Sequence, residues 1–242
     1  TAPVSNASIL SCHRRRSTSA SWRKSSVSNV DVPDLTLFLD IVHTLEKIKA
    51  PYMIIGGFAA TMYGILRTTF DIDIVVDLRD EHVQALANTY PPPRYYADPE
   101  QMRNSIRLGM PFNIIDGKRG EKADLSPLTR DSRYRPAFGR RIRYEIQWAG
   151  EIPFAAWCAR PDDVIYGKFL AWDEGRSLKH ESDIYDMLVF RYLEADPALA
   201  STFDEAYLDA QAKGLGPDVE ALWLSIKRAA QEEAQRCDSP LF

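Results

Sequence analysis

The sequence predicts an α+β protein, in which a mixed sheet flanked by helices is followed by a helical C-terminal part. Short apolar segments typical of strands alternate with amphipathic helical patterns up to about residue 150. From Pro161 onward the strand pattern stops, and only helical patterns follow. A chain of 242 residues, 45% of them hydrophobic, is long enough to bury a core without disulfide bonds.

The first 32 residues differ in composition from the rest of the chain. They are rich in serine, hold five basic residues and contain no acidic residue before Asp31, so we expect a disordered leader. A nucleic-acid-binding arm and a transit-like peptide are the alternatives. Because the whole chain has a net charge of −4 and residues 1–30 carry five positive charges, residues 31–242 carry about nine negative charges net. This balance argues against non-specific nucleic-acid binding by residues 33–242.

The first half of the sequence predicts two helix–strand pairs. A helix begins after Pro33–Asp34, carries apolar residues at helical spacing and ends before Pro51. A buried strand over residues 52–55 runs directly into Gly56–Gly57, and a short helix over 58–63 follows. Residues 70–76 are predicted to form a second strand, and residues 81–90 a helix before three prolines.

The second half predicts three more strands and then four helices. Strands are expected at residues 112–115, 122–125 and 142–148. The first two are predicted to pair as a hairpin, because residues 117–120 form a tight-turn signal in which Asp116 is a turn residue. The predicted helices lie at residues 161–172, 180–194, 197–212 and 217–236, and the first of them opens on Pro161.

Two aspartates in the second predicted strand are the strongest candidates for chemistry. Asp71 and Asp73 project from the same face of the strand, because residues i and i+2 of a strand share a face. Two neighbouring carboxylates repel each other unless a cation lies between them. Mg²⁺ binds one or two carboxylates and takes its other ligands from water and phosphate. This pattern therefore predicts a magnesium site.

A glycine pair supplies the second part of the predicted site. Gly56 and Gly57 follow a strand and precede a helix, where backbone N–H groups can approach a phosphate closely. Either a glycine pair or two alternating aspartates is weak evidence alone. Together, on a strand–Gly-Gly–helix–strand arrangement, they indicate a triphosphate cradle beside a metal site.

With these residues the chain resembles the nucleotidyltransferase superfamily related to DNA polymerase beta, and within it the minimal and abortive-infection-type nucleotidyltransferases. The resemblance includes a third carboxylate on a later strand, at Asp124. It continues through Arg160–Lys168 and Lys179–Met187, which resemble two helical motifs of that group. The resemblance spans residues 35–192. It implies a catalytic domain over 33–155 and a helical subdomain over 156–242 that closes the cleft.

The resemblance implies transfer of a nucleoside monophosphate from a nucleoside triphosphate to a hydroxyl acceptor, with release of pyrophosphate. We expect Asp71, Asp73 and Asp124 to be catalytic and to hold two Mg²⁺ ions. We expect the nucleotide to be bound by Gly56 and Gly57 and by three further residues, Arg67, Lys168 and Asp183. Lys168 lies near an apolar helical face, from which it can reach the triphosphate. Asp183 can orient Lys168 or the nucleotide.

The functional hypotheses differ in the acceptor that receives the nucleotide. A run of six arginines between Arg130 and Arg143 slightly favours a macromolecule, RNA or protein, as in toxin or antitoxin enzymes, although a solvated loop also explains the run. The alternatives are an enzyme that modifies a small molecule such as an antibiotic, and a non-catalytic binding protein with the same fold. We expect a cytoplasmic protein with no membrane partner, acting with a partner protein or as a homodimer.

Overall fold

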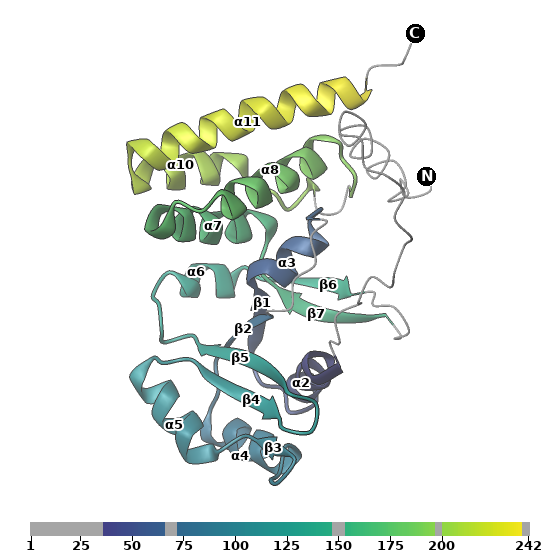
Figure 1. The fold of residues 1–242 in the computed structure, drawn as a ribbon, viewed down its shortest axis with the longest axis vertical. Helices are drawn as coiled ribbons and strands as arrows, with labels where there is room; N and C mark the ends of the chain where they lie inside the picture. Colours follow the sequence, from purple (N-terminus) through teal and green to yellow (C-terminus); the bar gives the residue numbers. More distant parts are fainter. Residues whose placement is uncertain (1–35, 66–71, 147–152, 197–199, 239–242) are drawn as a thin grey trace, which may run out of the picture. The chain divides into compact units, whose positions relative to one another are not determined.

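The structure is a computed structural model that describes residues 36–65, 72–146, 153–196 and 200–238 (Figure 1). It has the predicted α+β class: a mixed seven-stranded sheet flanked by helices, and a part formed by helices alone. The predicted leader, residues 1–32, and residues 66–71, which include Arg67 and Asp71, lie outside the described residues. None of the helices that the structure describes is long and apolar enough to cross a membrane.

The sheet has the strand order β3-β4-β5-β2-β1-β7-β6. Its central strands, β1 and β2, pair antiparallel, and each also has a parallel neighbour, β7 beside β1 and β5 beside β2. The outer pairs β3–β4, β4–β5 and β6–β7 are antiparallel. The strands span Tyr52–Ile55 (β1), Asp73–Val76 (β2), Tyr95–Tyr96 (β3), Phe112–Asp116 (β4), Glu121–Pro127 (β5), Ile142–Ile146 (β6) and Phe154–Cys158 (β7).

Burial alternates along β4 and β5, as expected for strands with one covered face. Ile114 and Leu125 are fully buried, whereas their neighbours Asn113 and Asp124 are half-buried. Helix α2 (Thr36–Lys47) packs against β5 and buries seven of its twelve residues. The core therefore lies under one face of these strands, and the polar side chains lie on the other face.

The β4–β5 hairpin has the predicted pairing, and Asp116 has the predicted role in its turn. The Asp116 carboxylate accepts hydrogen bonds from the backbone N–H groups of Lys118 and Arg119 at 2.9 and 3.3 Å. Arg94 donates to the same carboxylate at 2.7 Å and holds its pKa below the usual range. Asp116 is therefore committed to the turn and is not available to the candidate site.

Four elements were not predicted from the sequence. They are β3, β7, α5 (Pro99–Leu108) and α6 (Tyr134–Gly139). Helix α5 has only one buried residue, Met102, and few apolar residues in all, so an apolar pattern does not reveal it. Helix α6 has only six residues and contains Pro136. The strand β7 lies after the last predicted strand, residues 142–148, and it pairs with β1 through Ile54 and Cys158.

The chain divides into two compact units. One contains the sheet and comprises residues 33–62 and 66–164; the other is helical and contains residues 63–65 and 165–242. The division falls inside α7, after Val164, so β7 and the first turn of α7 belong to the sheet-containing unit. The remaining helices are α3 (Gly56–Met62), α4 (Asp80–Thr89), α7 (Pro161–Gly175), α8 (Leu178–Tyr192), α10 (Glu205–Leu215) and α11 (Pro217–Asp238).

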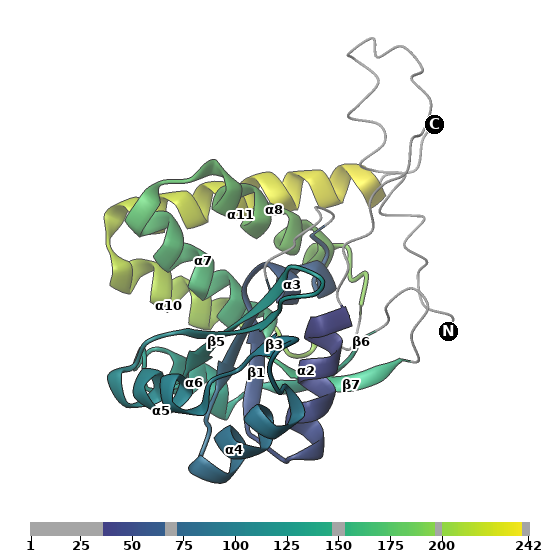
Figure 2. The ribbon, with the colours of Figure 1, turned by 60° about the horizontal axis from the view of Figure 1, so that its bottom comes forward.

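Within the helical unit, α11 packs along α8 and against α10, and both views show the three together (Figures 1 and 2). Trp223 of α11 is almost fully buried, and its ring meets that of Phe169 edge-on, with 5.4 Å between the centroids. Helix α10 begins later than predicted: the Asp204 carboxylate caps it by accepting a hydrogen bond from the Tyr207 N–H at 2.9 Å.

Candidate active site

Gly56 stands where strand β1 meets helix α3, and its conformation requires glycine. Its φ of +69° lies in the left-handed region, which costs other residues about 1–2 kcal/mol. A Cβ atom on Gly56 would lie 2.4 Å from the Asp73 carboxylate oxygen Oδ2. The backbone of this turn therefore approaches the Asp73 carboxylate more closely than any side chain would allow.

Strand register places two of the predicted carboxylates side by side. Asp73 opens β2, and its neighbour in the parallel strand β5 is Asp124. Neighbouring strands are about 4.8 Å apart, and residues in register project from the same face. Asp73 and Asp124 thus form a carboxylate pair on adjacent strands, and both are half-buried. Asp71, the other expected member of the group, lies outside the described residues.

Two polar neighbours of Asp124 were not predicted as site residues. The Lys122 ammonium lies 3.1 Å from Asp124 Oδ2 and 3.4 Å from Oδ1. Asn113 of β4 is the register partner of Asp124 on its other side. Lys122 had a sequence signal, since it stands two residues before Asp124 on one strand. Asn113 had none, because its place depends on the pairing of β4 with β5.

The phenol of Tyr134 in α6 is also close enough to Asp73 for that carboxylate to affect its pKa. Burial raises the pKa of the Tyr134 phenol, and the negative charges of Asp131 and Asp73 add to the increase, while Arg130 and Arg133 oppose it. No local pattern pointed to this residue, because α6 has only six residues and was not predicted as a helix.

The donor set around Asp73 and Asp124 fits a magnesium ion. Two carboxylates on neighbouring strands match the one or two that Mg²⁺ takes from protein, and the tight Gly56 turn leaves the Asp73 side uncrowded by a side chain. Throughout the described ranges, no group of three or more histidine, cysteine, aspartate or glutamate residues could hold a metal ion. The described donors are thus a pair, and Asp71 stays a predicted ligand that lies outside the described residues.

In the helical unit, Lys168 and Asp183 form a buried ion pair. The Lys168 ammonium of α7 donates to Asp183 Oδ2 of α8 at 2.6 Å, and the two side chains are only 7% and 2% exposed. A buried pair of this kind is tolerated because each charge satisfies the other. The predicted orientation of Lys168 by Asp183 is thus a contact of this structure, while nucleotide binding by either residue stays a prediction.

Much of the arginine run between Arg130 and Arg143 is engaged inside the sheet-containing unit. Arg133 pairs with Asp131 at 2.6 Å, and Arg143 pairs with Glu46. Arg141 lies over the ring of Trp157, 4.8 Å from its centroid. The exposed members of the run include Arg130 and Arg135. Most of these arginines therefore contact other side chains of the same unit.

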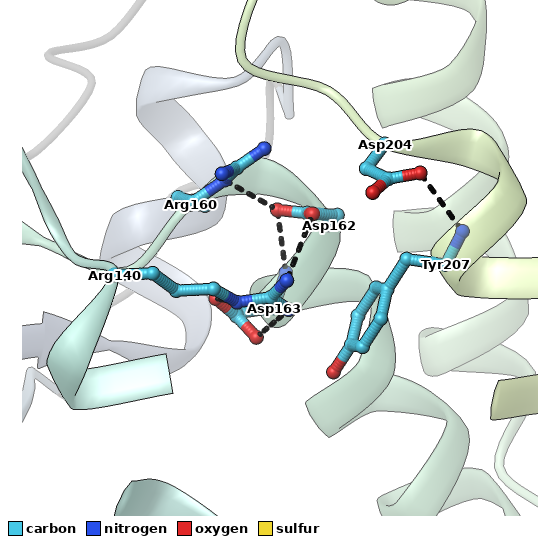
Figure 3. A network of polar contacts seen from close by, with 6 residues as sticks. All are labelled: Arg140, Arg160, Asp162, Asp163, Asp204 and Tyr207. Atoms are coloured by element: carbon cyan, nitrogen blue, oxygen red, sulfur yellow. Dashed lines mark hydrogen bonds and ion pairs between the residues drawn. The ribbon is translucent and has the colours of Figure 1, made fainter. Parts of the chain in front are cut away.

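Arg140 joins α6 to the first turn of α7 (Figure 3). Its guanidinium donates to both oxygens of Asp163, at 2.9 and 2.5 Å, and lies 3.7 Å from Asp162. Arg160 donates to Asp162 at 3.2 Å. Burial, together with the charge of Asp163, raises the pKa of the fully buried Asp162. This cluster fixes the C-terminal end of α6, the helix that begins at Tyr134.

No protein-family model and no curated protein matches the sequence. Among solved structures, the chain is similar to an antigenic nucleotidyltransferase-like protein from Paracoccidioides brasiliensis, with 17% identity, a TM-score of 0.43, and coverage of 78% of this chain and 91% of that one. It is also similar to the antibiotic-resistance factor ANT(2'')-Ia, with 16% identity, a TM-score of 0.39, and coverage of 74% and 96%. The function of this chain has to be argued from its own side chains.

Proposed function

We propose that the chain is a magnesium-dependent nucleotidyltransferase, which moves a nucleoside monophosphate from a triphosphate to a hydroxyl acceptor. The observation that carries the proposal is the pairing of Asp73 with Asp124 on adjacent strands, beside a glycine turn that touches Asp73. Proteins rarely place two half-buried carboxylates in register for structural reasons alone, because their charges repel. A site for divalent cations and a polyphosphate explains the arrangement.

In the proposed reaction, the acceptor oxygen forms a bond to the α-phosphorus as the bond to the β-phosphate oxygen breaks, and pyrophosphate leaves. Asp71, Asp73 and Asp124 would hold the magnesium ions, which stabilise the charge on the phosphates and lower the pKa of the attacking hydroxyl. Asp124 would either complete the second metal site or accept the hydroxyl proton. The backbone N–H groups of Gly56 and Gly57 hold the phosphates in line for attack. Arg67, Lys168 and Asp183 remain proposed contacts of the nucleotide.

For the acceptor we propose a macromolecule, RNA or protein, as in toxin–antitoxin systems. The exposed side chains of Arg130 and Arg135, on the segment that leads into α6 and within it, support this proposal. A small-molecule acceptor is the alternative, and it is favoured by the internal engagement of Arg133, Arg140, Arg141 and Arg143. A partner protein or a homodimer remains proposed as well.

One experiment tests the reaction and identifies the acceptor class. The protein is incubated with Mg²⁺, a cell extract and each of the four ribonucleoside triphosphates labelled on the α-phosphate, and RNA, protein and small-molecule fractions are separated. We expect label in one fraction together with release of pyrophosphate. Label in RNA or protein supports the macromolecular acceptor, and label in the small-molecule fraction supports the alternative. If pyrophosphate is released from none of the triphosphates, the chain is a non-catalytic binding protein.

Replacing Gly56 by alanine is expected to impair both stability and transfer. The left-handed φ costs alanine about 1–2 kcal/mol, and the new methyl group pushes the Asp73 carboxylate out of position. A displacement of the carboxylate by about 1 Å lowers the rate of transfer about a hundredfold. The measurements are kcat from pyrophosphate release and the free energy of unfolding from urea titration.

Gly139→Ala is the matched control for this variant. Gly139 belongs to the same unit, and a Cβ atom there meets nothing within 4 Å. We expect it to keep wild-type activity. Equal activity of Gly56→Ala and wild type would show that the turn does not position Asp73.

A further inference from the structure

Lys122 occupies the position beside Asp124 that a cation would take. The two residues are two apart on β5, so they share a face of the strand, and the ammonium contacts both carboxylate oxygens, at 3.1 and 3.4 Å. Asp124 in turn lies in register with Asp73. Without a metal ion, one positive charge of the chain itself thus reduces the repulsion between these two carboxylates.

The ion pair between Lys122 and Asp124 is open to water, so another cation can replace the ammonium group. The Lys122 side chain is 56% exposed and that of Asp124 is 34% exposed. Ion pairs this open to water contribute little, because solvent screens the attraction and the long side chain loses freedom. The buried pair in the helical unit, by contrast, is closed to water. A divalent cation carries twice the charge of an ammonium group and can replace it at a solvent-accessible carboxylate.

We propose that Lys122 is a positioning residue that competes with the divalent cation for Asp124. Its ammonium keeps the carboxylate oriented toward the site face until the cation arrives, and the cation must displace it to bind. The ammonium group therefore preforms the geometry of the site and at the same time weakens metal binding. This inference rests on the proposed function, since it assumes that Asp124 is a metal ligand.

Removing the competing charge should tighten metal binding. We expect Lys122→Met to bind Mn²⁺, a spectroscopic probe for Mg²⁺ sites, about five- to tenfold more tightly than the wild-type protein, because the cation no longer has to displace an ammonium group. Lys122→Arg keeps the charge and should remain within about twofold of wild type. Binding is measured by isothermal titration calorimetry and by the electron paramagnetic resonance signal of free Mn²⁺, without nucleotide.

Lys118→Met is the matched control. Lys118 lies in the turn of the same hairpin, is exposed, and loses the same charge on substitution, but its backbone N–H rather than its side chain makes the hydrogen bond of the turn. It should leave Mn²⁺ affinity unchanged. If methionine at position 122 prevents folding, Lys122→Gln makes the same test with a polar side chain. A double-mutant cycle completes the design: in an Asp124→Asn protein, Lys122→Met should have no effect.

The outcomes separate this inference from the proposed function. Tighter Mn²⁺ binding by Lys122→Met that disappears in the Asp124→Asn background supports the inference. Equal affinities of wild type and Lys122→Met overturn it, and so does equal tightening by Lys118→Met, but both outcomes leave the proposed function standing if Asp124→Asn still weakens binding. Absence of Mn²⁺ binding by the wild-type protein refutes the inference and the metal-dependent function together.

Discussion

Replacing Asp73 by alanine is expected to abolish nucleotidyl transfer while leaving the protein folded. The variant removes one of the two adjacent carboxylates, and with it a ligand for the cations that would stabilise the reacting phosphates. Losing several kcal/mol of such stabilisation lowers the rate by about a thousandfold or more. The fold should survive, because the substitution also relieves the repulsion between Asp73 and Asp124. Single-turnover pyrophosphate release measures the rate, and circular dichroism with a thermal melt measures the fold.

Asp77→Ala is the control for this variant. Asp77 directly follows the same strand, is exposed, and contributes its backbone N–H to a hydrogen bond with the Pro51 carbonyl, which alanine preserves. It should retain wild-type turnover and stability. Asp124→Ala should resemble Asp73→Ala. Turnover of Asp73→Ala at the wild-type rate would remove the basis of the proposed enzyme.

Replacing Asp183 by alanine is expected to destabilise the helical unit by about 3–5 kcal/mol. The substitution removes the carboxylate that pairs with the buried Lys168 ammonium, and breaking a buried ion pair by removing one partner is among the costliest changes to a folded protein. Urea unfolding followed by far-ultraviolet circular dichroism measures the loss. Ion pairs of the exposed surface give a contrasting expectation, since they typically contribute less than about 1 kcal/mol.

A double variant identifies the origin of this effect. Lys168→Met combined with Asp183→Leu removes both charges and keeps apolar volume between α7 and α8, so it should recover most of the lost stability. Transfer activity then separates structure from chemistry. A stable double variant without activity supports the predicted role of Lys168 at the nucleotide. If it is stable and fully active, the pair is purely structural. If Asp183→Ala is as stable as wild type, Lys168 does not depend on Asp183.

The sequence could predict the parts of the fold that rest on local patterns. The glycine turn after β1, the β4–β5 hairpin and the opening of α7 at Pro161 all follow from residue types at fixed positions. Helix α5 shows what a purely apolar pattern misses. It has a capping Asp98, a proline at its start and a left-handed Gly109 at its end, but a single buried residue. Its capping residues, rather than its periodicity, were the usable signal.

The candidate site was predictable only in part, for a related reason. Two aspartates on one strand are a local pattern, but the placement of Asp124 beside Asp73 depends on the pairing of β2 with β5. Local propensity does not determine which strands become neighbours, because pairing is decided by how the whole sheet buries its apolar face. The family resemblance supplied Asp124. Lys122, Asn113 and Tyr134 were missed because their proximity to the carboxylates exists only in the assembled sheet.

The parallel pairing of β2 with β5 also determines when the pair of carboxylates can form. Its two register-matched carboxylates are separated by about 50 residues of chain, which include α4, α5 and the first strand of the hairpin. Bringing such distant segments together carries a loop-closure cost that contacts between neighbouring segments do not. A fragment that stops before β5 holds only half of the carboxylate pair, however well its helices form. The carboxylate pair thus forms only when β2 and β5 meet in the middle of the sheet.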